Sequence, residues 1–348
     1  MLGYFKYSLA FTAVCFAAAF WWGLRTPDGW LVAVGVTAIL AIVEISLSFD
    51  NAVVNATVLR EMDEKWQGLF LTVGILIAVF GMRLVFPILV VAVATLENSK
   101  GTFVAHMSSV TVLAFENPAE YARHLRDAHT GIAAFGGMFL IMVFFTFLFD
   151  HNRERHWLGR AEIWLAGLGR HKSLKAAAAL AVLLVVQWLI PLSDEARLTV
   201  FISGVSGVVL FFGIHALGNL FDTKEGRKAL TETAHRNGAM GFVYLEILDA
   251  SFSFDGVIGA FAITRDVVII MLGLAIGAMF VRSLTVFLLR RGTLDKFVFL
   301  EHGAHYAIGA LGLIMLYSIM QHVSELVTGL VGVTLIGLSV YSSIKDKR

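Results

Sequence analysis

The chain has 348 residues, of which 58% are hydrophobic and only 15% are charged. Soluble domains carry about 25% charged residues, and apolar runs of about 18 or more residues recur along this chain, so composition excludes a soluble enzyme. The formal net charge of +1 gives no overall attraction to nucleic acid, and the single Cys15 excludes an internal disulfide or a thiolate metal cluster. The sequence predicts an all-α polytopic membrane protein, with residues 1–348 forming a single membrane domain.

Ten apolar segments separated by polar breaks are predicted to span the membrane. They lie at residues 5–24, 30–58, 67–96, 131–149, 174–192, 197–218, 239–263, 266–289, 303–320 and 323–342. The first resembles a signal peptide, but Phe20, Trp21 and Trp22 are typical of an interfacial anchor, so we expect it to be retained. Most Lys and Arg residues fall in the loops on one side, which predicts that both termini are cytoplasmic.

Two long loops are predicted between these spans. Residues 97–130 lie outside in this topology, and the run from Asn117 to Glu120 has the pattern of a helix start, which predicts a short helix over residues 118–129. Residues 150–175 form a basic cytoplasmic loop whose tryptophans stand among Arg and Lys, as in amphipathic segments at lipid headgroups. Membrane lipid is therefore an expected partner, and nucleic acid is not.

An acidic motif occurs twice in the chain. Residues 44–52 read EISLSFDNA, and residues 249–257 read DASFSFDGV. An arginine follows each copy in the next predicted span, nine residues after a glycine in both cases. The matched pairs are Glu44 with Asp249, Asp50 with Asp255, Ser48 with Ser253 and Arg83 with Arg282. Chance similarity between apolar segments rarely extends to ionisable residues at matched spacing, so we interpret the motif as an internal repeat.

The two copies lie on the second and seventh predicted spans, which cross the bilayer in opposite directions. The repeat is therefore of the inverted-topology kind, with a first core over residues 30–95 and a second over residues 239–290. In membrane transporters, such repeats place the substrate site near the bilayer midplane, where the two halves meet and rock to give alternating access.

Several acids lie inside predicted spans, where each costs about 2.5–3.5 kcal/mol to insert at a helix centre. They are Glu44, Asp50, Glu246, Asp249 and Asp255. Arg83 and Arg282 can balance two of them, so a cation, protons or both must neutralise the rest. The alternative is that the acids pair with arginines or serines only to hold helices together. Glu246 has no counterpart in the first copy, where Ala41 stands, which suits a proton carrier or an asymmetric partner.

Carboxylates, the Asn51 amide and serine hydroxyls are hard oxygen donors, which favour manganese, magnesium or calcium over softer metals. The predicted metal ligands are Glu44, Asp50, Asn51, Asp249 and Asp255. The predicted supporting or proton-coupling residues are Ser48, Arg83, Glu246, Ser253 and Arg282. On an unbroken helix Asp50 would point about 120° away from Glu44, so either the helix unwinds near residues 47–49 or the two acids have different roles. We favour unwinding.

A second polar group opens the ninth predicted span. Glu301, His302 and His305 stand near the cytoplasmic face, where they suit a secondary site for cation release or a proton relay. The alternative is a set of interfacial residues at a helix start.

With these motifs the chain resembles the TerC family of integral membrane proteins, grouped with the lysine-exporter superfamily, and most closely its longer branch. The first family signature, an acid followed by Leu-Ser-x-Asp-Asn-Ala, is matched by Glu44, Leu47, Ser48, Asp50, Asn51 and Ala52. The second signature is matched by Asp249, Phe252, Ser253, Asp255, Phe261, Ala262, Thr264, Asp266 and Arg282. Gly256 and Ile258 depart from it, because they stand where the family has Ser and Pro.

The resemblance implies a divalent-cation exporter of a bacterial inner membrane. Mn²⁺ is the cation it implies first, with Ca²⁺ and Mg²⁺ as alternatives. Together with the charge argument, this predicts a transporter and not an enzyme, and it predicts no particular oligomeric state. Two other classes of protein are alternatives. An intramembrane aspartyl protease would use Asp50 and Asp255, but Phe49 and Phe254 precede them where such proteases need a Gly-x-Gly-Asp setting. A non-transporting membrane partner or insertion helper would use the acids to hold a structural ion.

Overall fold

The structure is a computed structural model of the chain. It describes residues 2–60, 62–70, 72–95, 102–151, 153, 155–169, 172–221, 238–290, 296–321 and 323–346. Within these ranges some positions are described by their backbone alone, Asp255 among them. The described residues are mostly α-helical and contain no strand, which confirms the predicted all-α class.

The described part of the chain contains seven helices that are long and apolar enough to cross a membrane. An eighth span results if α9 (Arg160–Leu168) and α10 (Lys172–Leu189), which meet at a bend of 107°, are taken together. The chain is therefore a multi-pass membrane protein. Two further predicted spans are helices, α12 (Ala239–Ile263) and α15 (Leu300–Ser318), but acids in α12 and a glutamate with two histidines in α15 make them more polar. The ten-span topology stays a prediction.

The chain folds as two compact units, which do not follow the order of the sequence. Unit 1 comprises residues 1–128 and 245–291, and unit 2 comprises residues 129–244 and 292–348. Both copies of the acidic motif therefore belong to unit 1, together with the two arginines that follow them.

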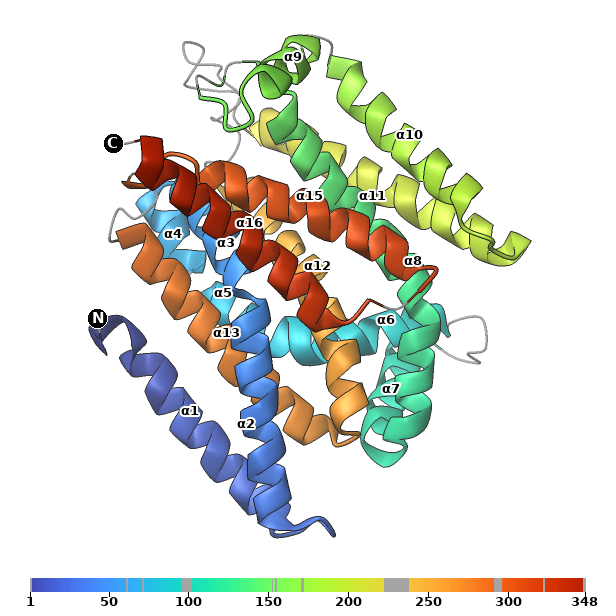
Figure 1. The fold of residues 1–348 in the computed structure, drawn as a ribbon. Coiled ribbons are helices and arrows are strands. Elements are labelled where there is room, and N and C mark those ends of the chain that lie inside the picture. Colours follow the sequence, from blue (N-terminus) through green and yellow to red (C-terminus); the bar gives the residue numbers. More distant parts are fainter. Residues whose placement is uncertain are drawn as a thin grey trace. The chain divides into compact units, whose positions relative to one another are not determined.

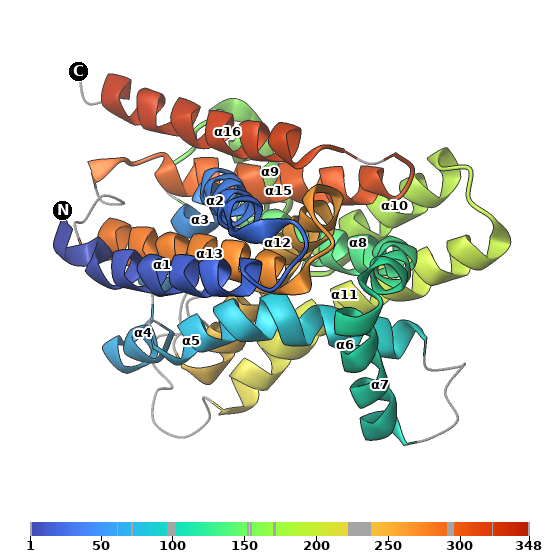
Figure 2. The same ribbon diagram turned by 90° about the horizontal axis from the view of Figure 1, so that it is seen from below.

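Unit 1 is built around helices α1, α2 and α13, which lie side by side (Figures 1 and 2). Cys15, Ala41 and Ile276 are buried together where these three helices meet. Its elements are α1 (Leu2–Gly23), α2 (Gly29–Leu47), α3 (Phe49–Arg60), α4 (Glu64–Phe70), α5 (Val73–Leu76), the π-helix η1 (Ile77–Val85), α6 (Phe86–Ala94), α7 (Phe103–Glu116), the start of α8 (Pro118–Leu148), most of α12, and α13 (Val267–Arg290).

The region expected to be an outer loop with one short helix is largely helical. Helix α7 is followed at Pro118 by α8, which runs on to Leu148, so the expectation that this helix ends near residue 129 is wrong. The expected helix start is confirmed, since Asn117 Oδ1 accepts the Glu120 N–H at 3.4 Å and Asn117 Nδ2 donates to Glu120 Oε2 at 2.8 Å. The helix continues because no proline follows Pro118 within it, and its glycines, Gly131, Gly136 and Gly137, cost only about 1 kcal/mol each.

Unit 2 contains the rest of α8, α9, α10, α11 (Asp194–Phe221), the start of α12, α15 and α16 (Glu325–Asp346). Helices α15 and α16 lie side by side (Figure 1). Their close approach depends on Gly303, where a Cβ atom would lie 2.3 Å from Ser339 Oγ. At the end of the pair, the Phe299 N–H donates to Ser343 Oγ at 2.8 Å.

Candidate functional site

The first acidic copy lies on a broken helix, as the sequence favours. Helix α2 ends at Leu47, Ser48 has non-helical torsions (φ −96°, ψ 19°), and α3 begins at Phe49. Ser46 contributes to the distortion, because its Oγ donates to the Ile42 carbonyl at 2.7 Å, a bond that bends helices. Glu44 and Asp50 thus belong to different helices.

Helix α3 is short, and every residue from Asp50 to Leu59 is buried. Asp50 lies in its first turn, where its Oδ1 accepts the Asn51 N–H at 2.8 Å. The helix dipole and the free N–H groups stabilise a negative charge at this position. The structure therefore gives Asp50 a place at a helix N-terminus, apart from the arginines that contact the other described acids.

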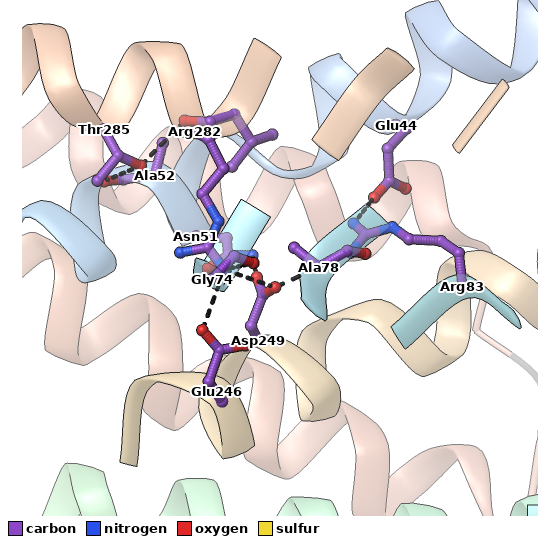
Figure 3. Close-up of polar contacts among 11 residues, drawn as sticks. Glu44, Asn51, Ala52, Gly74, Ala78, Arg83, Glu246, Asp249, Arg282 and Thr285 are labelled. Atoms are coloured by element: carbon purple, nitrogen blue, oxygen red, sulfur yellow. Dashed lines mark hydrogen bonds and ion pairs between the residues drawn. The ribbon is translucent and has the colours of Figure 1, made fainter. Parts of the chain in front are cut away.

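Arg83 joins the two acidic copies. Its Nη2 lies 2.6 Å from Glu44 Oε1, and its Nη1 lies 3.8 Å from Asp249 Oδ2 (Figure 3). The π-helix η1 positions this side chain, since Arg83 Nη1 also donates to the Ala78 carbonyl at 2.7 Å. Short π-helical segments are rare and occur frequently at functional sites.

Asp249 lies at the centre of the contacts between the copies. Asn51 Nδ2 donates to Asp249 Oδ1 at 2.8 Å, and Arg282 Nη2 lies 3.4 Å from Asp249 Oδ2 (Figure 3). Arg282 also reaches Glu246 Oε1 at 3.6 Å and lies 3.6 Å above the ring of Phe70. We call Glu44, Arg83, Glu246, Asp249 and Arg282 the arginine–acid network.

Glycines on neighbouring helices shape the space around Glu44. A Cβ atom at Gly277 would lie 2.2 Å from Glu44 Cγ, so α13 can approach this acid only with glycine at that position. A Cβ atom at Gly256 would lie 3.0 Å from Glu44 Oε2. Glu44 of the first copy is therefore in contact with the end of the second motif, at the position where the TerC signature has serine.

Several buried polar atoms beside the network have no hydrogen-bond partner within the described part of the chain. They are Asn51 Oδ1, both amide atoms of Asn55, both carboxylate oxygens of Glu246, Ser253 Oγ and Arg282 Nη1. Asn55 lies one turn beyond Asn51 on the same face of α3, and none of its surface is exposed. Buried polar groups normally have partners, so these are the atoms that a bound water or ion would contact.

The predicted metal ligands are only partly brought together. Asn51 contacts Asp249, and Arg83 links Asp249 to Glu44, whereas Asp50 accepts the backbone N–H of Asn51. The side chain of Asp255 lies outside the described residues. Among the described side chains, no three His, Cys, Asp or Glu residues are arranged to hold a metal ion. The metal-binding role of the five residues stays a prediction.

The second predicted group lies at the start of α15. His302 and His305 are both buried, with 3% of each exposed. His305 Nδ1 lies 2.9 Å from the carbonyl of Glu301, and its ring stacks on Phe147 at 4.0 Å. Glu301 occupies the first turn of α15, where an acid favours the helix dipole.

His302 instead belongs to a buried cluster that sequence reasoning missed. Its centre is Glu162 on α9, which is fully buried. Glu162 Oε1 accepts from the Tyr306 hydroxyl at 2.7 Å, and Oε2 accepts from the Trp157 N–H at 2.9 Å and lies 3.3 Å from Arg153 Nη2. His302 Nε2 lies 3.6 Å from the same oxygen. We call Arg153, Trp157, Glu162, His302 and Tyr306 the Glu162 cluster.

The basic segment thus contributes a buried acid to unit 2. Helix α9 does expose Ile163 and Trp164, as expected for an amphipathic anchor, but it turns Glu162 inward. The available signal was that Glu162 stands between alanine and isoleucine, in a segment that is rich in arginine and also contains Asp150 and Glu154. An acid with apolar neighbours among arginines is a candidate for an internal ion pair.

The chain belongs to the family described as "Protein of unknown function (DUF475)", whose model matches residues 49–348. A search of curated proteins found no match, and a search of solved structures found none either. The family description names no activity, and the resemblance to the TerC family stays a prediction.

Proposed function

We propose that this member of the DUF475 family is a secondary transporter of a hard divalent cation, with Mn²⁺ the foremost candidate and Ca²⁺ and Mg²⁺ the alternatives. The observation that carries the proposal is the charge balance of unit 1. Among the side chains of unit 1 that the structure describes, the buried acids Glu44, Asp50, Glu246 and Asp249 outnumber the buried arginines Arg83 and Arg282 by two. Two negative charges in a low-dielectric interior are neutralised by one divalent cation or by protons.

The donor set supports the same cation class. Carboxylates and the Asn51 amide are hard oxygen ligands, and the unpartnered oxygens of Asn51, Asn55 and Glu246 lie in the same region of unit 1. The break at Ser48 is of the kind found in the discontinuous helices of transporters, where irregular backbone lines a substrate path.

The arginines supply a mechanism. Arg83 and Arg282 hold Glu44, Asp249 and Glu246 while no cation is bound. An arriving cation competes with the guanidinium groups for the same carboxylates, and its departure lets them return. Such exchange avoids leaving buried carboxylates unpaired, which costs about 3–5 kcal/mol for a broken buried pair. Protons taken up by Glu246 would couple the cycle to a proton gradient.

The cellular location of the protein and the direction of transport are part of the same proposal. A bacterial inner membrane, cytoplasmic termini and outward movement of the cation rest on the charge of the loops and on the resemblance to the TerC family. This is a transport role without an enzymatic reaction.

A second candidate is a non-transporting membrane partner or insertion helper. The short contact of 2.6 Å between Arg83 and Glu44 favours it, because a closed network can serve to hold helices together. In that case the cation, if bound, would be structural.

The test compares binding with flux in the full-length protein. Titration calorimetry with MnCl₂ should show about tenfold or greater weakening in Glu44→Gln and Asp249→Asn, because both remove a carboxylate from the arginine–acid network. Glu162→Gln is the matched control, since Glu162 is a buried acid of unit 2, and it should bind Mn²⁺ normally. Unchanged affinity in both network variants would remove the proposed site.

Flux separates the two candidates. Proteoliposomes containing the wild-type protein and an internal Mn²⁺-sensitive dye should show uptake that both network variants lose. Tight binding without uptake would overturn the transporter and leave the structural ion.

A further inference from the structure

Away from the arginine–acid network, unit 1 contains a cavity of about 390 Å³. Its lining comes from the first turns of α8, including Ala122 and Arg126, and from the end of α12 and the turn that follows it, including Phe261, Thr264 and Arg265. The cavity thus has two arginines at its rim and an apolar wall, and nothing in the proposed transport cycle uses it.

The two arginines are available for a ligand. Within the described part of the chain, the side chains of Arg126 and Arg265 form no ion pair and no hydrogen bond. The acid next to Arg265 is engaged elsewhere, because Asp266 Oδ1 accepts the N–H groups of Val268 and Ile269 at 2.9 and 3.2 Å. Glu120 on α8 is likewise engaged, since its Oε2 accepts from Asn117 at 2.8 Å.

The residues around the cavity indicate that it lies at the level of the lipid headgroups. The turn at residues 264–266 connects α12 to α13, and α13 is one of the helices that are long and apolar enough to cross a membrane. Asp266 Oδ2 also accepts from Trp22 Nε1 at 2.7 Å, and the neighbouring Trp21 carries Arg25 over its ring at 3.6 Å. Tryptophan and arginine in this combination are characteristic of the membrane interface.

We propose that this cavity binds a phosphate group, supplied by the headgroup of an anionic phospholipid. The two guanidinium groups match phosphate oxygens in charge and geometry, and the side chain of Phe261 with the neighbouring alanines offers an apolar surface to the glycerol and the first acyl carbons. Free phosphate shares the recognised chemistry, and the experiment distinguishes the two sources.

The experiment uses the full-length protein purified in detergent and stripped of lipid. Dihexanoyl phosphatidylglycerol is titrated in one arm and followed by native mass spectrometry, and sodium phosphate is titrated in the other and followed by calorimetry. The variant is Arg126→Gln with Arg265→Gln. Both side chains are exposed, so the double variant should fold, and its melting temperature is measured alongside. Arg123→Gln is the control, since this exposed arginine lies on α8 but does not line the cavity.

The lipid should bind to the wild type and to Arg123→Gln with similar affinity, and about tenfold more weakly to the double variant. The same pattern with sodium phosphate, and no difference with the lipid, would overturn the lipid and assign the cavity to free phosphate. Equal binding of both probes to the wild type and the double variant would overturn the site altogether. Mn²⁺ binding by the double variant should stay unchanged, so failure here leaves the transport proposal standing.

Discussion

Two buried charge clusters in this protein differ in how completely the carboxylate oxygens of their acids are hydrogen-bonded. In the Glu162 cluster of unit 2, both carboxylate oxygens of one acid are bonded, by Tyr306, by the Trp157 N–H and by Arg153. In the arginine–acid network of unit 1, three acids share two arginines, and both oxygens of Glu246 have no hydrogen bond among the described residues. The carboxylate of Glu162 is thus fully bonded, although Arg153 Nε and His302 Nδ1 have no partner among the described residues, whereas the carboxylate of Glu246 is not hydrogen-bonded.

This difference distinguishes a structural ion pair from a candidate cation site. A buried acid that serves the fold recruits enough donors to satisfy each oxygen, since an unsatisfied buried group costs about 1–3 kcal/mol. A cation site leaves carboxylate or amide oxygens free for its ligand. On this criterion unit 1, with its excess of acids and its unpartnered amides, is the candidate site, and the Glu162 cluster fastens α9 to α15.

The largest expected effect is the loss of stability when an arginine of a cluster is replaced by glutamine. Arg83→Gln removes the cation that faces both Glu44 and Asp249, so metal-free protein should lose about 3–5 kcal/mol of stability. Added Mn²⁺ should restore part of this loss because it replaces the missing charge. Thermal unfolding with MnCl₂ and with a chelator should therefore show a larger Mn²⁺-induced rise in melting temperature for Arg83→Gln than for the wild type.

Arg153→Gln is the corresponding variant in the Glu162 cluster of unit 2, to be compared with Arg83→Gln. It should also destabilise the protein, since it leaves Glu162 without its guanidinium partner, but Mn²⁺ should make no difference to the loss. An equal response to Mn²⁺ in the two variants would contradict the distinction drawn between the clusters.

A smaller effect should come from crowding Glu44. In Gly277→Ala the new methyl group would lie 2.2 Å from Glu44 Cγ, so the acid must shift, at a cost of about 1–3 kcal/mol. Mn²⁺ affinity, measured by calorimetry, should fall with it. Gly35→Ala on α2 is the matched control, because no atom lies within 4 Å of its Cβ position, and it should leave stability equal or up to about 1 kcal/mol higher. Normal Mn²⁺ affinity in Gly277→Ala would show that the position of Glu44 is unimportant.

The smallest effect on stability, and the sharpest on function, is expected at Asn55. Neither of its amide atoms has a partner among the described residues, so Asn55→Leu should change the free energy of unfolding by no more than about 1 kcal/mol. If this amide faces the cation path, Mn²⁺ uptake by proteoliposomes should drop. Thr57→Val on the same helix, whose hydroxyl is already bonded to the Val53 carbonyl, should keep full uptake. A large loss of stability with normal uptake in Asn55→Leu would assign the residue to the fold.

The repeat itself was visible in the sequence, but its two copies differ in the structure. The helix breaks at Ser48 in the first copy, whereas α12 runs unbroken through the second. Arg83 lies on a π-helix and Arg282 on an ordinary α-helix. Matching residues in the two copies predict matching positions in the membrane. Local backbone geometry depends instead on the helices packed against each copy, as with the glycines that let α13 approach Glu44.

The sequence alone does not show which residues make up the Glu162 cluster. Glu162 and Tyr306 are 144 residues apart, and their contact depends on how α9 folds back onto α15 within unit 2. The extent of α8 was missed for a related reason. A polar stretch followed by an apolar one looks like a loop and a span, yet nothing between Pro118 and Leu148 interrupts the backbone hydrogen bonds.

Amino-acid composition and spacing alone determined that this chain lies in a membrane, that it is helical, and that one acidic motif occurs twice, because burial in lipid restricts charge so severely that its placement carries information. Only the tertiary structure decided which arginine contacts which acid, that Asp50 stands apart at the start of α3, and which polar atoms lack partners. Those outcomes depend on distances of a few ångströms between helices far apart in the chain, and linear order does not contain them.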